Sequence, residues 1–390
     1  MDFIDSFSER DTRDELGIAV LRDAISERMF PGTTTIQTRA RYFLFVPWLL
    51  QRTERYAREA RSLSDVVRHA REQEFTLMRS LEAGGVKPGE GLFGSSAGNA
   101  LRRLPSEIYW QGLGRWGIRQ FPAGRAQLLR TLAAARSSLR ELADEDIPAG
   151  SPGAKYWHAG LPQPPKGLLE STNFSLTFEE ASYLRDRVLA AAPMSLLARL
   201  MSTSRSDVDC GKPWLHPGLS AFSDLQKWEL GHAERFSLVV NGAALLYNLM
   251  LAEKRNQSGS EAADGWVADY QERLASWAKE AVNAQLADWD LADFWRLIGE
   301  TGARYSVSTR DFVERWLEVA LHDPASIAVR KEARSLIHVR ERSLKGSLAR
   351  LDNEEALRRW NGSSGAQRLD FRWGTVQVIV NDVVHGLASP

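Results

Sequence analysis

The sequence has little cysteine, little lysine and no net charge. Its 390 residues include one cysteine, Cys210, so the chain can form neither an internal disulfide nor a cysteine-based zinc site, and a cytoplasmic location is expected. The 50 basic residues equal the 50 acidic ones, which means that no global field steers the chain toward nucleic acid or a membrane. The first residues lack the features of a secretion signal, and no run of about 18 apolar residues predicts a membrane span.

Motifs of common enzymes are also missing. The seven histidines are scattered, with no His-x-His or His-Glu-x-x-His spacing, and no Gly-x-Ser-x-Gly elbow or Walker motif occurs. Gly112, Gly114 and Gly117 have the spacing of a dinucleotide-binding loop, but no strand precedes them, so tight helix packing is the favoured explanation. The sequence therefore predicts no catalytic residue, no metal ligand and no cofactor.

Two acidic pairs leave an enzymatic alternative open. Asp207 with Asp209, and Asp288 with Asp290, have a spacing that could hold Mg²⁺, although such pairs are more often helix caps and turns. A metal-dependent nuclease of unfamiliar design is therefore the least favoured hypothesis. It requires metal-dependent turnover that a single carboxylate substitution abolishes.

Apolar periodicity predicts helices along almost the whole chain. One helix is expected over 12–30, begun by a capping box of Thr12 and Glu15, and another over 36–61 with a kink or a first turn at Pro47. Further helices are expected at 63–83, 97–104, 106–118, 124–143, 177–191, 193–202, 228–255, 261–287, 289–299, 309–322, 325–341, 353–360 and 372–386.

Strand patterns are few. β-Branched runs occur only at 238–240 and 376–380, each inside a longer helical pattern. A second capping box, Thr177 with Glu180, supports another helix start. The predicted fold class is all-α and multi-helical, with at most a small β-hairpin.

Proline and glycine are concentrated between residues 148 and 171. Such a composition is typical of a domain boundary. The sequence therefore predicts an N-terminal helical domain over 1–147, a linker over 148–171 and a C-terminal helical domain over 172–390. The middle of the chain is acidic, and its two ends are basic.

Arginine supplies most of the basic charge. Lysine occurs at nine positions, so the other 41 basic residues are arginine, which suits bidentate contacts to phosphate or carboxylate and stacking on aromatic rings. A GC-rich genome produces the same bias. The local surplus is greatest over 102–140, where a helical pair at 101–119 could place arginines on phosphates. Alternatively, this surface faces an acidic partner or the acidic middle of the same chain.

Arginine also accompanies tryptophan or threonine near both ends of the chain. In the last sixty residues, interleaved Arg and Trp could hold a phosphate backbone and stack a base, or could instead seal the core and pair with acidic residues. Near the start, 33–35 with Arg39 and Arg41 could form an anion site or an ordinary helix cap. The predicted nucleic-acid or partner-binding residues are Arg39, Arg41, Arg102, Arg103, Arg115, Trp116, Arg119, Arg358, Arg359, Trp360, Arg368, Arg372 and Trp373.

Three sequence blocks carry a family resemblance: GTTTIQTRARYFLFVPWLL at 32–50, RRLPSEIYWQGLGRWGIR at 102–119 and RRWNGSSGAQRLDFRW at 358–373. Together they resemble a bacterial family catalogued only as a domain of unknown function. That family spans essentially the whole chain and occurs in gene neighbourhoods with helicase-type and nuclease-type anti-phage defence proteins. The resemblance implies a role in a multi-gene defence system, and it transfers no catalytic residue.

The favoured function is a non-catalytic subunit of a multi-protein bacterial anti-phage defence system. We expect it to engage DNA, or a DNA-processing partner of the helicase or nuclease type, through arginine-rich surfaces, with no membrane partner. The alternative is a protein scaffold or adaptor without nucleic-acid contact. Salt-sensitive DNA binding distinguishes the two. The favoured hypothesis requires that the arginines near both ends converge on one outward-facing surface.

Overall fold

The computed structural model describes residues 14–94, 103–141, 156–203, 207–259 and 262–389. Within these ranges the ordered elements are helices, and the β-structure amounts to an isolated bridge between Arg119 and Trp157. The β-branched runs at 238–240 and 376–380 lie inside helices. The all-α prediction is confirmed.

The chain divides into two compact units, each built from separated segments. Unit 1 comprises Met1–Phe3, Met29–Gly211 and Arg372–Pro390, and unit 2 comprises Ile4–Arg28 and Lys212–Phe371. The segment 148–171, predicted to be a linker, falls within unit 1 in this division. Its described part packs there, since Tyr156 and Trp157 are buried and the backbone N–H of His158 donates to the carbonyl of Ile118 at 2.8 Å.

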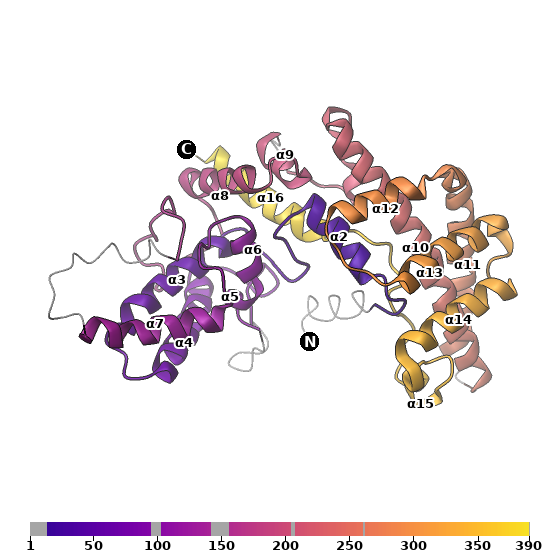
Figure 1. The fold of residues 1–390 in the computed structure, drawn as a ribbon, viewed down its shortest axis with the longest axis horizontal. Helices are drawn as coiled ribbons and strands as arrows, with labels where there is room; N and C mark the ends of the chain where they lie inside the picture. The colour runs from indigo at the N-terminus through magenta and orange to yellow at the C-terminus, as the bar shows by residue number, and fades with distance from the viewer. Residues whose placement is uncertain (1–13, 95–102, 142–155, 204–206, 260–261, 390) are drawn as a thin grey trace. The chain divides into compact units, whose positions relative to one another are not determined.

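Unit 1 contains two groups of packed helices (Figure 1). In one, α3, α4 and α7 pack against one another, and the short α5 and α6 follow α4 along the chain. In the other, α8, α9 and the C-terminal α16 pack together, which joins segments far apart in sequence. The helices are α3 (Tyr42–Ala57), α4 (Leu63–Ala83), α5 (Pro105–Ile108), α6 (Trp110–Arg115), α7 (Arg125–Glu141), α8 (Phe178–Ala191), α9 (Leu196–Thr203) and α16 (Trp373–Ala388).

Unit 2 is organised around one long helix, α10 (Asp224–Gln257), against which α11, α13 and α14 pack (Figure 1). By length and composition α10 could cross a membrane, yet 83% of its most apolar window is buried within the protein. The other elements are α2 (Ala19–Met29), η2 (Pro213–Leu215), η3 (Leu219–Ala221), α11 (Ala262–Asn283), η4 (Leu286–Asp288), α12 (Leu291–Glu300), α13 (Val307–His322), η5 (Pro324–Ser326), α14 (Lys331–Lys345), η6 (Gly346–Leu348) and α15 (Glu354–Arg358).

The first predicted helix is shorter than its periodicity indicates. It begins at Ala19, and the carboxylate of Asp14 accepts the backbone N–H groups of Ile18 at 2.6 Å and Ala19 at 3.0 Å. Gly17 has a φ of +68°, a conformation that interrupts a helix before α2. The start predicted over 12–18 is therefore wrong where the structure describes it, and Thr12 lies outside the described residues.

Other boundaries also move inward. The helix predicted over 36–61 occupies Tyr42–Ala57, with Pro47 inside it, and the one predicted over 106–118 is two short helices separated at Tyr109. The prediction over 63–83 matches α4. The second capping box is confirmed, since the hydroxyl of Thr177 accepts the backbone N–H of Glu180 at 3.2 Å.

The core of unit 1 is aromatic. The first turn of α3 buries Tyr42, Phe43 and Phe45, three aromatic side chains within four residues. Phe43 stacks on Trp116 with ring centroids 3.8 Å apart. This packing fixes the position of α3, from which the surface described below extends.

Candidate functional site

The two arginines of the N-terminal block are held inside unit 1. Arg39 donates from Nε and Nη2 to the carboxylate of Asp382, with Nη2 2.6 Å from Oδ1. Arg41 is buried, and its Nη2 lies 2.8 Å from Oε1 of Glu180 while its Nη1 donates to the carbonyl of Asn173. These guanidinium groups tie the loop before α3 to α16 and α8.

The threonines of that block are engaged only in part, since the buried hydroxyl of Thr34 has no hydrogen-bond partner among the described residues. Thr33 is buried and its hydroxyl donates to the carbonyl of Phe30 at 2.7 Å, while the backbone N–H of Thr34 donates to the side chain of Gln37. The block therefore has the geometry of a capped turn with paired arginines, the alternative to an anion site.

The predicted binding residues of the second block, at 102–119, include both buried and exposed side chains. Trp116 is buried, with its Nε1 donating to the carbonyl of Pro31 at 2.8 Å. Arg119 donates to the carbonyls of Trp110, Phe121 and Ala123, and burial lowers the pKa of its guanidinium. Arg103 and Arg115 are exposed. Arg102 lies outside the described residues.

The C-terminal block spans both units. In unit 1, Arg372 donates to the carbonyl of Thr33 at 2.6 Å, and Trp373 is buried with its Nε1 2.7 Å from the carbonyl oxygen of Cys210. In unit 2, Trp360 is buried edge-on to Trp266. The tryptophans predicted to stack bases therefore lie in cores.

The remaining arginines of this block differ in exposure. Arg368 pairs with Glu280 and donates to the carbonyl of Glu234 in unit 2. Arg358 and Arg359 are exposed, and Arg359 pairs with Glu355 one turn earlier. Among the predicted arginines with described positions, the exposed ones are Arg103, Arg115, Arg358 and Arg359, and their role in binding stays a prediction.

The glycine-rich motif has a packing explanation. A Cβ at Gly112 would lie 2.3 Å from the carbonyl oxygen of Gly32 and 2.8 Å from the ring of Phe43. Gly112 therefore permits α6 to approach the loop before α3, as tight helix packing requires.

The acidic pairs do not assemble a metal site in the part of the chain that the structure describes, where no three His, Cys, Asp or Glu side chains are grouped for metal binding. Asp290 caps α12 by accepting the backbone N–H of Asp293 at 3.1 Å. Asp207 contacts His385, with 2.5 Å between Oδ1 and Nε2. Asp209 and Asp288 belong to no such group.

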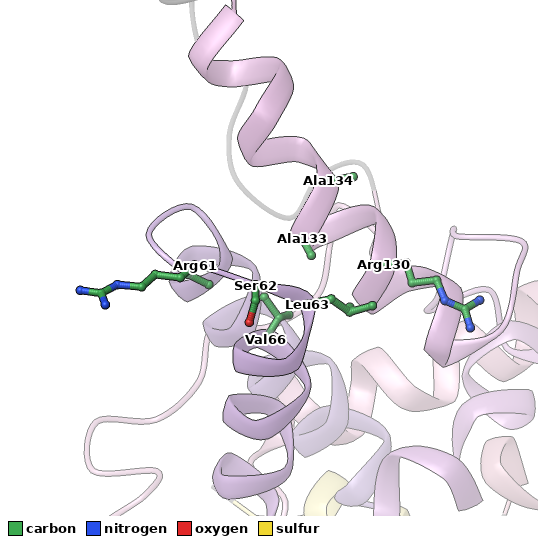
Figure 2. Close-up of a pocket in the computed structure, with 8 residues that line it drawn as sticks. Arg61, Ser62, Leu63, Val66, Arg130, Ala133 and Ala134 are labelled. Carbon is green, nitrogen blue, oxygen red and sulfur yellow. The ribbon is translucent and has the colours of Figure 1, made fainter.

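A small hollow opens between α4 and α7 in unit 1. Its volume is about 350 Å³, and Figure 2 shows Leu63 and Val66 of α4 facing Ala133 of α7. Arg61 and Arg130 extend away from it on opposite sides. We call this hollow the α4–α7 notch; the residues that line it are Ala60, Arg61, Ser62, Leu63, Val66, Arg130, Ala133 and Ala134.

The polar groups at the floor of the notch are already satisfied. Ser62 caps α4 by accepting the backbone N–H of Asp65 at 3.2 Å, and its hydroxyl also lies 2.7 Å from that of Ser64. Asp65 places a carboxylate in the first turn of α4, where it complements the positive end of the helix dipole. The interior of the notch therefore offers a ligand mainly aliphatic surface.

The helices around the notch carry a surplus of exposed arginine. Over α3, α4, the loop between them and the described side chains of α7, the exposed acidic residues are Glu59, Glu72 and Glu82. The exposed basic residues over the same stretch are Arg52, Arg55, Arg58, Arg61, Arg68, Arg71, Arg79 and Arg130. We call these eight side chains the arginine layer.

None of the eight arginines of the arginine layer is among the predicted site residues. Arg52, Arg55, Arg58 and Arg61 recur at a spacing of three at the polar end of α3 and beyond it, and this spacing is the sequence pattern that could have identified them. Glu54 is half-buried, whereas Glu59 and the four arginines are exposed, so the exposed surface of this stretch is more basic than its sequence.

A second charged cluster is buried in unit 2. The carboxylate of Glu341 is fully buried and accepts the hydroxyl of Tyr247 at 2.5 Å and the ammonium of Lys345 at 3.1 Å. Lys345 also pairs with Glu15, as does Arg350 with 2.8 Å between Nη1 and Oε1. These charged groups contact one another, and the network therefore links the start of unit 2 to α10 and α14.

The chain belongs to a family described as a family of unknown function (DUF6361), whose model matches residues 1–385. No curated protein and no solved structure matches it.

Proposed function

We propose that this member of the family is a non-catalytic subunit that engages DNA through the arginine layer of unit 1. The observation that carries the proposal is the surplus of exposed arginine over exposed glutamate on α3, α4 and α7. A polyanion recruits such a surface by releasing condensed counterions, and guanidinium groups form bidentate contacts with phosphate.

The charge of the whole unit supports the same proposal. Unit 1 has a basic excess and unit 2 an acidic excess, although the full chain is neutral. A neutral total therefore conceals a basic unit with an arginine surface. Arg103 and Arg115 belong to unit 1 and add exposed cations to it.

The buried tryptophans favour contact with the DNA backbone over stacking on bases. Trp116 and Trp373, the two tryptophans of unit 1 among the predicted binding residues, are 1% exposed and cannot present a ring to a ligand without unfolding their surroundings. Contacts to phosphate position a protein on DNA but carry no sequence information. We therefore expect binding with little sequence preference.

We place this activity in a multi-protein bacterial anti-phage defence system in the cytoplasm. The three sequence blocks that resemble a defence-associated family support this setting, and helicase-type or nuclease-type proteins are the expected partners. In that setting the protein would hold DNA for a neighbouring enzyme.

The test is DNA binding measured by fluorescence anisotropy at several salt concentrations. We expect wild-type binding to weaken steeply with salt, and the variant Arg55→Gln/Arg58→Gln/Arg61→Gln/Arg130→Gln to reduce the slope by about 0.9 for each lost phosphate contact. The matched control is Arg358→Gln/Arg359→Gln, which removes exposed arginines from unit 2.

Each outcome decides between hypotheses. An unchanged slope in the unit 2 control, with a reduced slope in the unit 1 variant, supports the arginine layer. If the control variant instead has the reduced salt dependence, the DNA contact lies in the predicted C-terminal block. If the wild-type protein shows no salt-sensitive DNA binding, while it co-purifies with its neighbouring gene products, the protein scaffold replaces the proposal.

A further inference from the structure

We propose that the α4–α7 notch docks a segment of a partner protein in which one bulky apolar side chain is flanked by acidic residues. This inference rests on the apolar lining of the notch, while its rim residues Arg61 and Arg130 also belong to the arginine layer that we propose to contact DNA.

The size of the notch fits one large side chain. Its volume of about 350 Å³ lies at the low end of the range for ligand pockets, about 300–1,000 Å³. An anchor that fills such a hollow is the typical centre of a protein interface, surrounded by contacts that exclude water.

The lining selects an apolar anchor. Val66 and Ala60, which line the notch, are buried, while Leu63 is 40% exposed although leucine is strongly hydrophobic. Covering Leu63 with an apolar group removes this surface from water, which favours association. The hydroxyl of Ser62 is engaged by Ser64 and Asp65, so it does not require a polar ligand.

The rim selects acidic neighbours for that anchor. Arg61 and Arg130 are the charged residues among those that line the notch, and they extend to opposite sides of it. Carboxylates on either side of the apolar anchor would therefore each meet a guanidinium group. Charge complementarity therefore favours a partner segment with acidic residues on both sides of the anchor.

A nucleobase fits the same hollow less well. Bases bind proteins by stacking on aromatic rings, and the lining residues include none. Because the lining of the notch contains no aromatic ring, a protein segment is favoured over a nucleobase.

The probe is a fluorescent peptide with one phenylalanine between runs of aspartate. We expect micromolar to millimolar affinity for the full-length protein, because a single anchor buries little surface, and we expect Leu63→Glu to weaken binding by about tenfold or more. Ala133→Trp, which fills the notch from α7 without adding charge, should weaken it similarly. The folded state of each variant is checked by its circular dichroism.

The matched control is Val67→Glu, because Val67 is 41% exposed on the same helix and does not line the notch. It adds the same charge as Leu63→Glu one turn further along, and we expect an effect below about threefold. Arg61→Gln/Arg130→Gln should weaken the peptide and reduce its salt dependence.

Several results would overturn the inference. One is equal binding of a peptide with serine in place of phenylalanine, which shows attraction by charge alone. Another is binding of single-stranded DNA that Leu63→Glu and Ala133→Trp abolish while Val67→Glu does not, which makes nucleic acid the occupant. The third is no peptide binding at millimolar concentration. Loss of DNA binding by itself bears only on the proposed function, because the peptide assay contains no DNA.

Discussion

The buried carboxylates are paired singly in unit 1, whereas unit 2 contains both a single pair, Glu229 with Arg28, and a connected network. In unit 1, each buried carboxylate meets one guanidinium group: Asp382 meets Arg39, and Glu180 meets Arg41. In the network of unit 2, Glu15 and Glu341 share Lys345, and Tyr247 donates to Glu341 and accepts from Lys345. Isolated pairs tie two segments each, whereas the network ties several segments at once.

The difference changes the protonation of the buried acids. Burial raises the pKa of Glu74 in unit 1, and Arg125, at 3.3 Å, together with hydrogen bonds from Ser106, offsets only part of this effect. The net pKa shift of Glu15 in unit 2 is downward. Burial by itself favours a higher pKa, but the hydrogen bond and charge of Lys345 and the charge of Arg350 outweigh this effect. Two close cations overcome desolvation where one does not.

The largest expected loss of stability follows from a substitution that breaks the buried network of unit 2. Glu341→Ala leaves Tyr247, Lys345 and two backbone N–H groups without their acceptor, and we expect a loss of about 3–5 kcal/mol in the free energy of unfolding. Urea denaturation followed by tryptophan fluorescence measures it.

The control for this variant is Glu355→Ala, which removes the exposed partner of Arg359 and should cost less than about 1 kcal/mol. Equal losses from the two substitutions would show that the buried network contributes no more than a surface pair, and the contrast between the units would then disappear.

A somewhat smaller effect is expected for an isolated pair in unit 1. Arg41→Met leaves the carboxylate of Glu180 buried, at a cost of about 3 kcal/mol. Because Glu180 still accepts the backbone N–H of Thr177, the double variant Arg41→Met/Glu180→Gln keeps the helix cap, removes the uncompensated charge and should recover most of the loss.

The corresponding double variant in unit 2, Glu341→Gln/Lys345→Met, should not recover, because Glu15 then loses one of its two cations. Urea denaturation of the two double variants compares an isolated pair with a network. Recovery in both units, or in neither, would contradict the distinction.

Much of the fold follows from local patterns in the sequence. The spacing of apolar residues predicts α4 with its observed bounds, and the Thr177–Glu180 capping box predicts the start of α8. Both depend on residues within one or two turns of each other. The start of α2 differs because Gly17 and Asp14 define it, and neither interrupts the apolar periodicity that extended the prediction.

The assignment of arginines to the interior does not follow from local patterns. Arg39 meets Asp382, which is 343 positions away in sequence, and no local spacing identifies such a partner. The same holds for α16, which packs on α8 within unit 1. A sequence rich in arginine is therefore equally compatible with binding surfaces and with internal ion pairs, until the fold shows which carboxylates the arginines contact.

The notch was beyond prediction for a different reason. Its lining is largely alanine, leucine and valine, which carry no chemical pattern, and it is formed where α7 passes the start of α4. Leu63 resembles any apolar residue at the beginning of a helix. The partial exposure that makes it informative is a property of packing.

The smallest effect tests the opposite pKa shifts of the two buried glutamates. The lowered pKa of Glu15 means that its contribution to stability is present above its ordinary value of 4.5 and is lost as the pH falls through the folded-state pKa. The raised pKa of Glu74 means that the folded state binds the proton more tightly, so its carboxylate destabilises the fold progressively as the pH rises above 4.5.

We therefore expect Glu15→Gln to cost most at neutral pH and little in acid. Glu74→Gln should become more favourable, relative to wild type, as the pH rises. Urea denaturation between about pH 3 and pH 7 gives both differences, because glutamate titrates in the lower part of that range and the lowered pKa of Glu15 moves its loss below 4.5. Differences that change with pH in the same direction would contradict the rule that the number of close cations decides the shift.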